Sequence, residues 1–266
     1  MYDRMKMVVK GDTRTFKTEH GIFQGEVTSP LFFALYISDL EKEMSDTGLG
    51  ANIVNIVVRL LSFADDLAVI SETREGLQSG LDKLLEYCLK WGLKVNVNKT
   101  KIVVFRKGGK LGAKDKWFYD GREVECVSYF RYLGCTMTYT GSFAKCKTEL
   151  VNSAGRASFP LSQFIYSNEI LPSTQMKLFD SIISPVLNYC CEVWGLSKSD
   201  PIERFHLKFM KTVLKVKPST PNCFVYGELG IRPLHIERQC RVIKYWLRII
   251  RGDAPYYVLC VYEELL

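Results

Sequence analysis

The sequence predicts an α+β protein in which a mixed helix–strand part is followed by an all-helical part. Residues 53–70 are rich in β-branched and other apolar residues, which favours strands. Residues 74–91 carry apolar residues along one helical face, and helical patterns separated by prolines recur beyond residue 140. We therefore expect a mixed domain over residues 1–139 and a helical domain over residues 140–266.

After strand-like residues at 14–18, a helix is expected over residues 31–44. Its apolar residues recur near helical spacing, at Leu31, Leu35, Leu40 and Met44. Pro30 suits the first turn, where its missing N–H leaves no partner unsatisfied, and Ser29 is the expected N-cap.

The strand-rich run follows this helix. Residues 53–70 predict a strand, a tight turn and a second strand, with Asp65 and Asp66 at the bend. Residues 74–91 predict a helix that Gly92 closes as a C-cap. Residues 94–106 are a strand candidate, and residues 123–138 predict two short strands on either side of the 132–134 segment.

Helices account for the rest of the chain. The expected ranges are 142–167, 173–191, 200–216 and 235–251. Prolines near their ends, such as Pro172, Pro201 and Pro233, support these breaks.

Composition indicates a globular protein with a modest positive charge. The chain is 47% hydrophobic and carries a net charge of +7, with most of the excess after residue 139. This balance permits a polyanionic partner without requiring one.

The nine cysteines form no CxxC pair, so we read them as reduced thiols packed as small hydrophobic residues. Neither a signal peptide nor a membrane-spanning run is visible, so we expect an intracellular protein, nuclear or cytoplasmic, with no membrane partner.

The sharpest chemical signal is the pair Asp65–Asp66 in the middle of the strand-rich run. Two adjacent carboxylates repel each other unless a cation neutralises them. Oxygen ligands suit Mg²⁺, and two such ions can hold the attacking and leaving oxygens of a phosphoryl transfer. We expect the hairpin that carries the pair to be buried on both sides. The alternative is a solvated Asp–Asp turn without a ligand.

A second signal precedes the helix expected at residue 31. Gly25 allows the backbone to approach a ligand closely, and Gln24 offers both a donor and an acceptor. The Ser29-Pro30 pair then starts the helix. The alternative is an ordinary loop and N-cap.

Both signals, in this order and about 40 residues apart in the sequence, resemble the palm of reverse transcriptases, and in detail those of non-LTR (LINE-like) retroelements. The Gln-Gly and Ser-Pro block is similar to one motif of this family, and Phe63-Ala64-Asp65-Asp66 is similar to its metal-binding tetrapeptide. Further similar segments follow in order: Trp91-Gly92-Leu93 with Asn96, Asn98, Lys99 and Thr100; residues 129–134; Tyr189 with Trp194-Gly195; and Pro233-Leu234.

The resemblance implies an RNA-directed DNA polymerase with a palm of antiparallel strands and packed helices, then a helical thumb and a post-polymerase region. It implies two Mg²⁺ ions in the intact enzyme, and an RNA template, a DNA primer and deoxynucleoside triphosphates as partners. The roles that it implies are metal binding and catalysis for Asp65 and Asp66, leaving-group protonation for Lys99, template and nucleotide contact for Gln24, Gly25, Phe63 and Ala64, and primer grip for Tyr132, Leu133 and Gly134. For Lys99 a plain surface lysine remains the alternative.

The sequence departs from the family pattern at its beginning. The first carboxylate motif of the family should precede the Gln-Gly block by several tens of residues, and Asp3, Asp12 and Glu19 do not fit it. We therefore expect an N-terminally truncated palm and thumb that lacks polymerase activity by itself. Two alternatives stay open: a non-catalytic protein that binds RNA or hybrid duplex, and a retroelement product without function.

Basic residues at helical spacing suggest contacts to a duplex backbone. Arg204, Lys208, Lys211 and Lys215 form the first such stripe. A second stripe consists of Arg238, Arg241, Lys244 (or Tyr245), Arg248 and Arg251. In a thumb, such stripes would follow phosphates without reading bases. The alternative for both is a solvated helix face.

Overall fold

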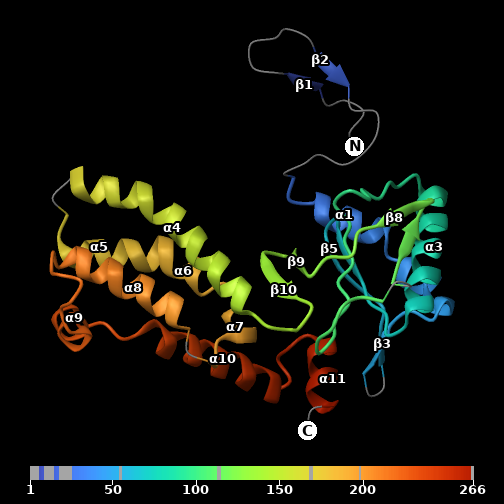
Figure 1. Cartoon of the computed structure of the whole chain (residues 1–266). Coiled ribbons are helices and arrows are strands. Elements are labelled where there is room, and N and C mark those ends of the chain that lie inside the picture. Colours follow the sequence, from blue (N-terminus) through green and yellow to red (C-terminus); the bar gives the residue numbers. More distant parts are fainter. Residues whose placement is uncertain are drawn as a thin grey trace. The chain divides into compact units, whose positions relative to one another are not determined.

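The computed structural model describes residues 6–8, 15–17, 26–53, 56–112, 115–167, 170–197 and 199–264 (Figure 1). It contains helices and small antiparallel sheets, which confirms the α+β class. The chain divides into two compact units, which we call unit 1 (Met1–Asn96 with Trp117–Glu123) and unit 2 (Val97–Lys116 with Val124–Leu266). The predicted palm–thumb boundary at residue 139 concerns function and stays a prediction.

Unit 1 is built around two-stranded antiparallel pairs. Strands β1 (Lys6–Val8) and β2 (Thr15–Lys17) pair with each other, as do β3 (Ala51–Ile53) and β4 (Ile56–Val58), and β5 (Leu60–Phe63) and β6 (Asp66–Val69). Backbone bonds join the last two pairs, because Ile70 N–H donates to Arg59 and Gly50 N–H donates to Ile70. The predicted strand–turn–strand is therefore confirmed around the bend, as β5 and β6. The single strand expected before the bend is wrong, because its residues form two short strands, β4 and β5, of which β4 pairs with β3.

Helix α3 (Arg74–Trp91) is the largest helix of unit 1 and confirms the helix predicted at these residues. The Thr73 hydroxyl accepts the Gly76 N–H and caps its start, and Gly92 ends it with φ 64°. Leu81, Leu84 and Cys88 are buried on its inner face. Gly76 and Gly80 are buried as well. A Cβ at either position would lie within 2.4 Å of an atom of the 48–49 segment, so only glycine fits there. The helix therefore packs closely at two positions that apolar spacing does not reveal.

The helix predicted over residues 31–44 is two short helices. Helix α1 (Ser29–Tyr36) and helix α2 (Leu40–Glu43) are separated by a turn, and the 3₁₀ turn η1 (Ser45–Thr47) follows. The expected N-cap is wrong by one residue, because Thr28 is the N-cap and Ser29 is already helical. Leu40 and Met44 are buried as expected, whereas Leu31 and Leu35 are about 60% exposed. The apolar spacing of the sequence therefore spans a break in the helix.

The 94–106 strand candidate is wrong. Residues 97–99 form a turn, and Ile102 makes only an isolated bridge to Cys126 within unit 2. The polar residues Asn96, Asn98 and Lys99 interrupt the pattern and favour a turn. A short hairpin of β7 (Trp117–Tyr119) and β8 (Arg122–Val124) comes next in the chain.

Unit 2 begins its regular structure with a hairpin and continues with helices. Strands β9 (Tyr129–Tyr132) and β10 (Cys135–Thr138) pair antiparallel, which confirms the two strands predicted here. The helices are α4 (Ala144–Ser167), α5 (Pro172–Leu178), α6 (Ser184–Leu187), α7 (Cys191–Trp194), α8 (Asp200–Val213), α9 (Asn222–Leu229), α10 (Leu234–Ile250) and α11 (Tyr256–Glu264). Figure 1 shows α4 beside α5 and α6, with the β9–β10 hairpin at one end of α4.

A single apolar core joins the elements of unit 2. Phe179, Ile183 and Leu187 are fully buried and pack with residues of α4, α7 and α8 in one cluster. Between α5 and α6 the chain makes a π-helical segment, η2 (Phe179–Ile183), so these three elements run on without a loop. Residues 180–182, which lie between the two buried ends of this segment, are exposed.

All nine cysteines are free thiols, and Cys135 and Cys146 contact each other at 3.7 Å between sulfur atoms. Among the helices in the described ranges, none has the length and apolar character needed to cross a bilayer.

Candidate functional site

The paired carboxylates lie at the tip of the β5–β6 hairpin. The register pairs Phe63 with Asp66, so Ala64 and Asp65 form a two-residue turn. Ala64 has φ 51°, a left-handed conformation that residues with a side chain rarely adopt. Such conformations persist where the surrounding structure fixes them, and they are common at functional sites. The hairpin thus presents Asp65 from the turn and Asp66 from the first residue of β6.

This tip is exposed, which corrects the expectation that the hairpin would be buried on both sides. Asp65 and Asp66 are exposed, and Phe63 exposes 63% of its surface. Residues at the other end of the hairpin, such as Leu60 and Val69, are half-buried, so the hairpin is anchored there. The carboxylates are therefore open to a ligand from outside unit 1.

The donor set suits a hard divalent cation in part. Two carboxylates give oxygen ligands of the kind that Mg²⁺ prefers, but Mg²⁺ takes six ligands in all. Within the described ranges, no group of three or more acidic, histidine or cysteine side chains is placed to bind a metal ion. Asp65 and Asp66 fit as part of a site whose other ligands would be water, substrate or a further protein group.

The other residues expected at the polymerase site are distributed over the chain. Gln24 and Gly25 lie outside the described residues. Lys99 is exposed in the turn at residues 97–99, which belongs to unit 2, whereas Asp65 belongs to unit 1. Phe63 and Ala64 share the β5–β6 tip with the carboxylates. The structure therefore brings together four of the expected residues, 63–66.

The segment expected to grip the primer is the β9–β10 turn. Tyr132 pairs with Cys135, which leaves Leu133 and Gly134 as a two-residue turn with φ 47° and 81°. Positive φ at both positions is the pattern of a type I′ turn, which suits the twist of an antiparallel hairpin. Leu133 is one of the few residues other than glycine with positive φ in the described part of the chain.

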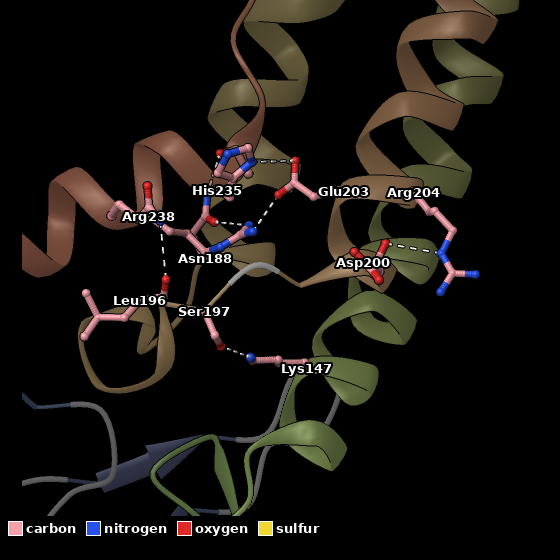
Figure 2. A network of polar contacts seen from close by, with 11 residues as sticks. Lys147, Asn188, Leu196, Ser197, Asp200, Glu203, Arg204, His235 and Arg238 are labelled. Carbon is pink, nitrogen blue, oxygen red and sulfur yellow. Dashed lines mark hydrogen bonds and ion pairs between the residues drawn. The ribbon is translucent and has the colours of Figure 1, made fainter. Parts of the chain in front are cut away.

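Basic residues of α8 are only partly aligned as predicted. Arg204 and Lys208 are exposed on α8, and Lys211 is half-buried with its ammonium group donating to the Pro218 carbonyl at 2.7 Å. Arg204 donates to the Asp200 carbonyl at 3.3 Å (Figure 2). Lys215 lies beyond the end of the helix with φ 53°, so the four-residue stripe is really three residues on α8 and one after it.

The second basic stripe is wrong at its first member. Arg238 is fully buried, and its guanidinium donates to Glu203 of α8 at 2.5 Å and to the Asn188 side-chain oxygen at 3.4 Å (Figure 2). Its guanidinium also lies 5.8 Å from the centre of the Trp194 ring. Arg238 therefore ties α10 to α8 and to the α6–α7 connection.

A sequence signal for this buried arginine existed. The buried residues of α10 are Leu234, Arg238 and Val242, which are spaced four residues apart. Arg238 thus continues the apolar face of α10, and a charge on such a face requires a buried partner. Glu203 and Asn188, which are also buried and provide that partner, were not singled out from the sequence.

Comparison with known proteins identifies the class to which these features belong. Residues 1–137, more than half of the chain, match the family described as reverse transcriptase (RNA-dependent DNA polymerase). The chain belongs to this family. The matched segment contains both the β5–β6 tip and the β9–β10 turn.

Curated relatives carry names from mobile elements. An RNA-directed DNA polymerase from mobile element jockey of Drosophila funebris is 23% identical over 205 residues, which cover 74% of this chain and 22% of the relative. A Pol polyprotein from the type-2 retrotransposable element R2DM of Drosophila melanogaster is 27% identical over 240 residues, 82% of this chain and 21% of the relative.

These relatives confirm the resemblance to polymerases of non-LTR retroelements. Because the alignment with the R2DM polyprotein covers 82% of the chain, it extends into the helical part beyond residue 137. The chain spans about a fifth of the length of these relatives.

Proposed function

We propose that the chain forms part of the palm (residues 1–139) and the thumb with a C-terminal extension (residues 140–266) of an RNA-directed DNA polymerase. The observation that carries this proposal is the exposed Asp65–Asp66 pair at a hairpin tip inside the segment that matches the reverse transcriptase family. The partners would be an RNA template, a DNA primer and deoxynucleoside triphosphates. Names of relatives that are RNA-directed DNA polymerases support this assignment.

Asp65 and Asp66 would hold Mg²⁺, with two ions in the intact enzyme. When bound, such ions stabilise the charge that develops on the phosphate as a nucleotide is transferred. Phe63 and Ala64, next to the carboxylates on the same tip, would line the floor below the primer terminus. Gln24 and Gly25 would contact the template–nucleotide pair, and Lys99 would donate a proton to the pyrophosphate leaving group.

Two further surfaces would hold the nucleic acid. Tyr132, Leu133 and Gly134 would position the primer strand through the β9–β10 turn. Arg204, Lys208, Lys211 and Lys215 would contact phosphates of the duplex, with Lys211 contributing less because its ammonium group already has a protein partner.

We further propose that the 266-residue chain alone does not complete the reaction. The β5–β6 tip supplies two carboxylates, and a two-ion site in this family is expected to use a third. Loss of part of such a site would remove about 3 kcal/mol or more of transition-state stabilisation.

Binding of Mn²⁺, a paramagnetic probe for Mg²⁺ sites, tests the proposal in the purified chain. We expect Asp65→Asn and Asp66→Asn each to weaken Mn²⁺ binding about tenfold, because each removes a charged ligand. The matched control is Asp120→Asn, since Asp120 is also exposed in a hairpin turn of unit 1, between β7 and β8, with φ 50°. Equal Mn²⁺ affinity in the wild type and both variants would contradict the proposed metal site.

Primer extension with an RNA template separates the remaining possibilities. We expect the chain to bind the hybrid duplex and to incorporate no nucleotides. Clear incorporation that is lost in Asp65→Asn would show that the chain is a complete polymerase and would contradict the proposed deficiency. Absence of any duplex binding would contradict the role of the thumb and favour a product without function.

A further inference from the structure

Tyr189, which follows helix α6, contacts the β9–β10 turn directly. Its hydroxyl donates to the carbonyl oxygen of Leu133 at 2.6 Å. A Cβ built on Gly134 would lie 3.0 Å from the Tyr189 ring, so the ring rests against the glycine backbone. One side chain from the helical part therefore touches both residues of the turn.

The conformation of this turn needs such support. Leu133 has φ 47°, where its Cβ crowds the backbone, and such a conformation persists only when the surrounding structure fixes it. Gly134 adopts φ 81°, where glycine alone is unstrained, and its lack of a side chain makes room for the Tyr189 ring. The hydrogen bond and the ring contact thus act on the two positions that define the turn.

Tyr189 is itself held in place on its other side. Its carbonyl oxygen accepts the Trp194 indole N–H at 3.2 Å. The preceding residue, Asn188, is buried and bonds to Ser184 at 3.1 Å and to Arg238 at 3.4 Å. The residue before Tyr189 therefore belongs to the buried network of Asn188, Arg238 and Glu203, which Figure 2 shows.

Burial does not explain the contact, because Tyr189 leaves 45% of its surface exposed. The neighbouring Cys190 thiol, and after it the loss of solvent, raises the pKa of Tyr189 above its ordinary value. The hydroxyl therefore keeps its proton at neutral pH and remains a donor to Leu133. The hydrogen bond from the Tyr189 hydroxyl to the backbone of the turn, and not burial, therefore accounts for the contact.

We propose that Tyr189 is a positioning residue that fixes the β9–β10 turn in the conformation in which it holds a primer end. This inference rests on the proposed function, in which the turn grips the primer. Tyr189 acts through Leu133 and Gly134 and does not itself need to touch the nucleic acid.

The test compares Tyr189→Phe with Tyr257→Phe in the full 266-residue chain. Tyr189→Phe keeps the ring and removes only the donor. Tyr257 on α11 is a matched control, because its exposed fraction of 43% is close to the 45% of Tyr189. Each protein is mixed with an RNA–DNA hybrid whose DNA strand carries a photo-crosslinking thymidine analogue either at its 3′ end or well upstream.

We expect Tyr189→Phe to lower cross-linking at the primer 3′ end by about tenfold, since small displacements at a positioning contact have large effects. Upstream cross-linking, total duplex affinity and the melting temperature should stay near those of wild type. A purely structural role would lower all of them together. Hydrogen exchange of the Gly134 and Cys135 amides in the free protein should be faster in Tyr189→Phe than in Tyr257→Phe.

The outcomes separate the inference from the proposed function. If Tyr189→Phe cross-links at the primer 3′ end as strongly as the wild type does, the inference is overturned and the proposed function stands. Unchanged exchange of the turn amides in Tyr189→Phe overturns it without reference to nucleic acid. Absence of 3′-end cross-linking in the wild type overturns the primer-gripping role of the turn and the inference with it.

Discussion

Arg238 shows how one buried charge is stabilised in unit 2. Its guanidinium is fully buried against Glu203, which is itself 6% exposed, with Asn188 as a further partner. Such a pair gives little net stability relative to apolar residues, but removal of one partner leaves an uncompensated charge in the core.

We expect Arg238→Met to lower the free energy of unfolding by about 3–5 kcal/mol, because Glu203 is then buried without its cation. Urea denaturation followed by circular dichroism measures this change. Arg241→Met is the control on the same helix, since Arg241 pairs with Glu237 in a half-exposed bridge and the substitution should cost less than about 1 kcal/mol. Equal costs for the two variants would contradict the buried ion pair.

His206 makes stability depend on pH. Burial first, and the charge of Arg238 second, lowers its pKa to about 4 from the ordinary value of 6.5. Within the described part of the chain, neither ring nitrogen has a hydrogen-bond partner, and the ring stacks on Phe179 with 5.1 Å between ring centres. The folded protein therefore holds this histidine neutral, whereas the unfolded chain binds a proton below pH 6.5.

The folded-state pKa is below that of the unfolded chain, so the contribution of His206 to stability is complete above pH 6.5 and is lost as the pH falls toward 4. We expect a loss of up to about 3 kcal/mol over this window. His206→Phe should flatten the decline, and His20→Gln, which changes a histidine far away in the sequence, should not. The measurement is urea denaturation at several pH values between these limits, and an identical decline in His206→Phe would contradict the assignment.

Helix α3 depends on glycines as well as on its apolar face. A Cβ on Gly76 would lie 2.4 Å from the carbonyl oxygen of Gly48, which is backbone and cannot rotate away. Gly155 in α4 has no atom within 4 Å of such a Cβ. A substitution by alanine would therefore clash with the backbone at Gly76 and meet open space at Gly155.

We expect Gly76→Ala to destabilise unit 1 by about 1–3 kcal/mol through this clash, despite the better helix propensity of alanine. Gly155→Ala should instead stabilise unit 2 by up to about 1 kcal/mol. Thermal and urea unfolding of both variants gives the two values. A neutral or stabilising Gly76→Ala would show that α3 does not pack closely on residue 48.

The sequence predicted an element correctly where the residues of that element alone determine its structure. The β5–β6 hairpin, α3 with its Gly92 end, and the β9–β10 hairpin follow from strand-forming residues, helical spacing and turn residues. Helices α9 and α11 were missed, because both are short and their apolar residues do not follow one face. The strand expected at residues 94–106 was wrong for another local reason: a cluster of polar residues favours the turn at residues 97–99.

The errors at Leu31, Leu35 and Arg238 have a different cause. Helical spacing shows which residues share a face, but the partner of that face lies elsewhere in the chain. Glu203 is 35 residues from Arg238, so the burial of the pair depends on how α8 and α10 pack. For the candidate site, residues 63–66 follow from the local hairpin, whereas their grouping with Lys99 and the β9–β10 turn comes only from the family resemblance.

Binding of a duplex should depend on charge carried by unit 2. The triple variant Arg204→Ala, Lys208→Ala and Lys211→Ala should weaken binding of an RNA–DNA hybrid and flatten its dependence on salt. The slope of log affinity against log salt should fall by roughly 2, since each phosphate contact contributes about 0.7–0.9 and Lys211 is already bonded to Pro218. Fluorescence anisotropy at several salt concentrations measures this slope.

A control of equal charge is available in unit 1. Arg74, Lys83 and Lys90 lie on α3 and pair with Glu75, Glu86 and Glu43 in exposed bridges. Their replacement by alanine lowers the net charge by the same amount and should leave the slope nearly unchanged. Equal effects of both triple variants would show that binding follows total charge and not α8.

The π-helical segment between α5 and α6 has a consequence for how the length of this chain can vary. One wide turn accommodates an extra residue while the flanking helices keep their angular phase. Phe179 and Ile183 stay in the core, and the extra residue lies among the exposed residues 180–182. Deletion of Ser181 should therefore leave a regular helix with both flanks still facing the core, whereas a one-residue deletion within α4 or α8 would rotate everything after it by about 100°.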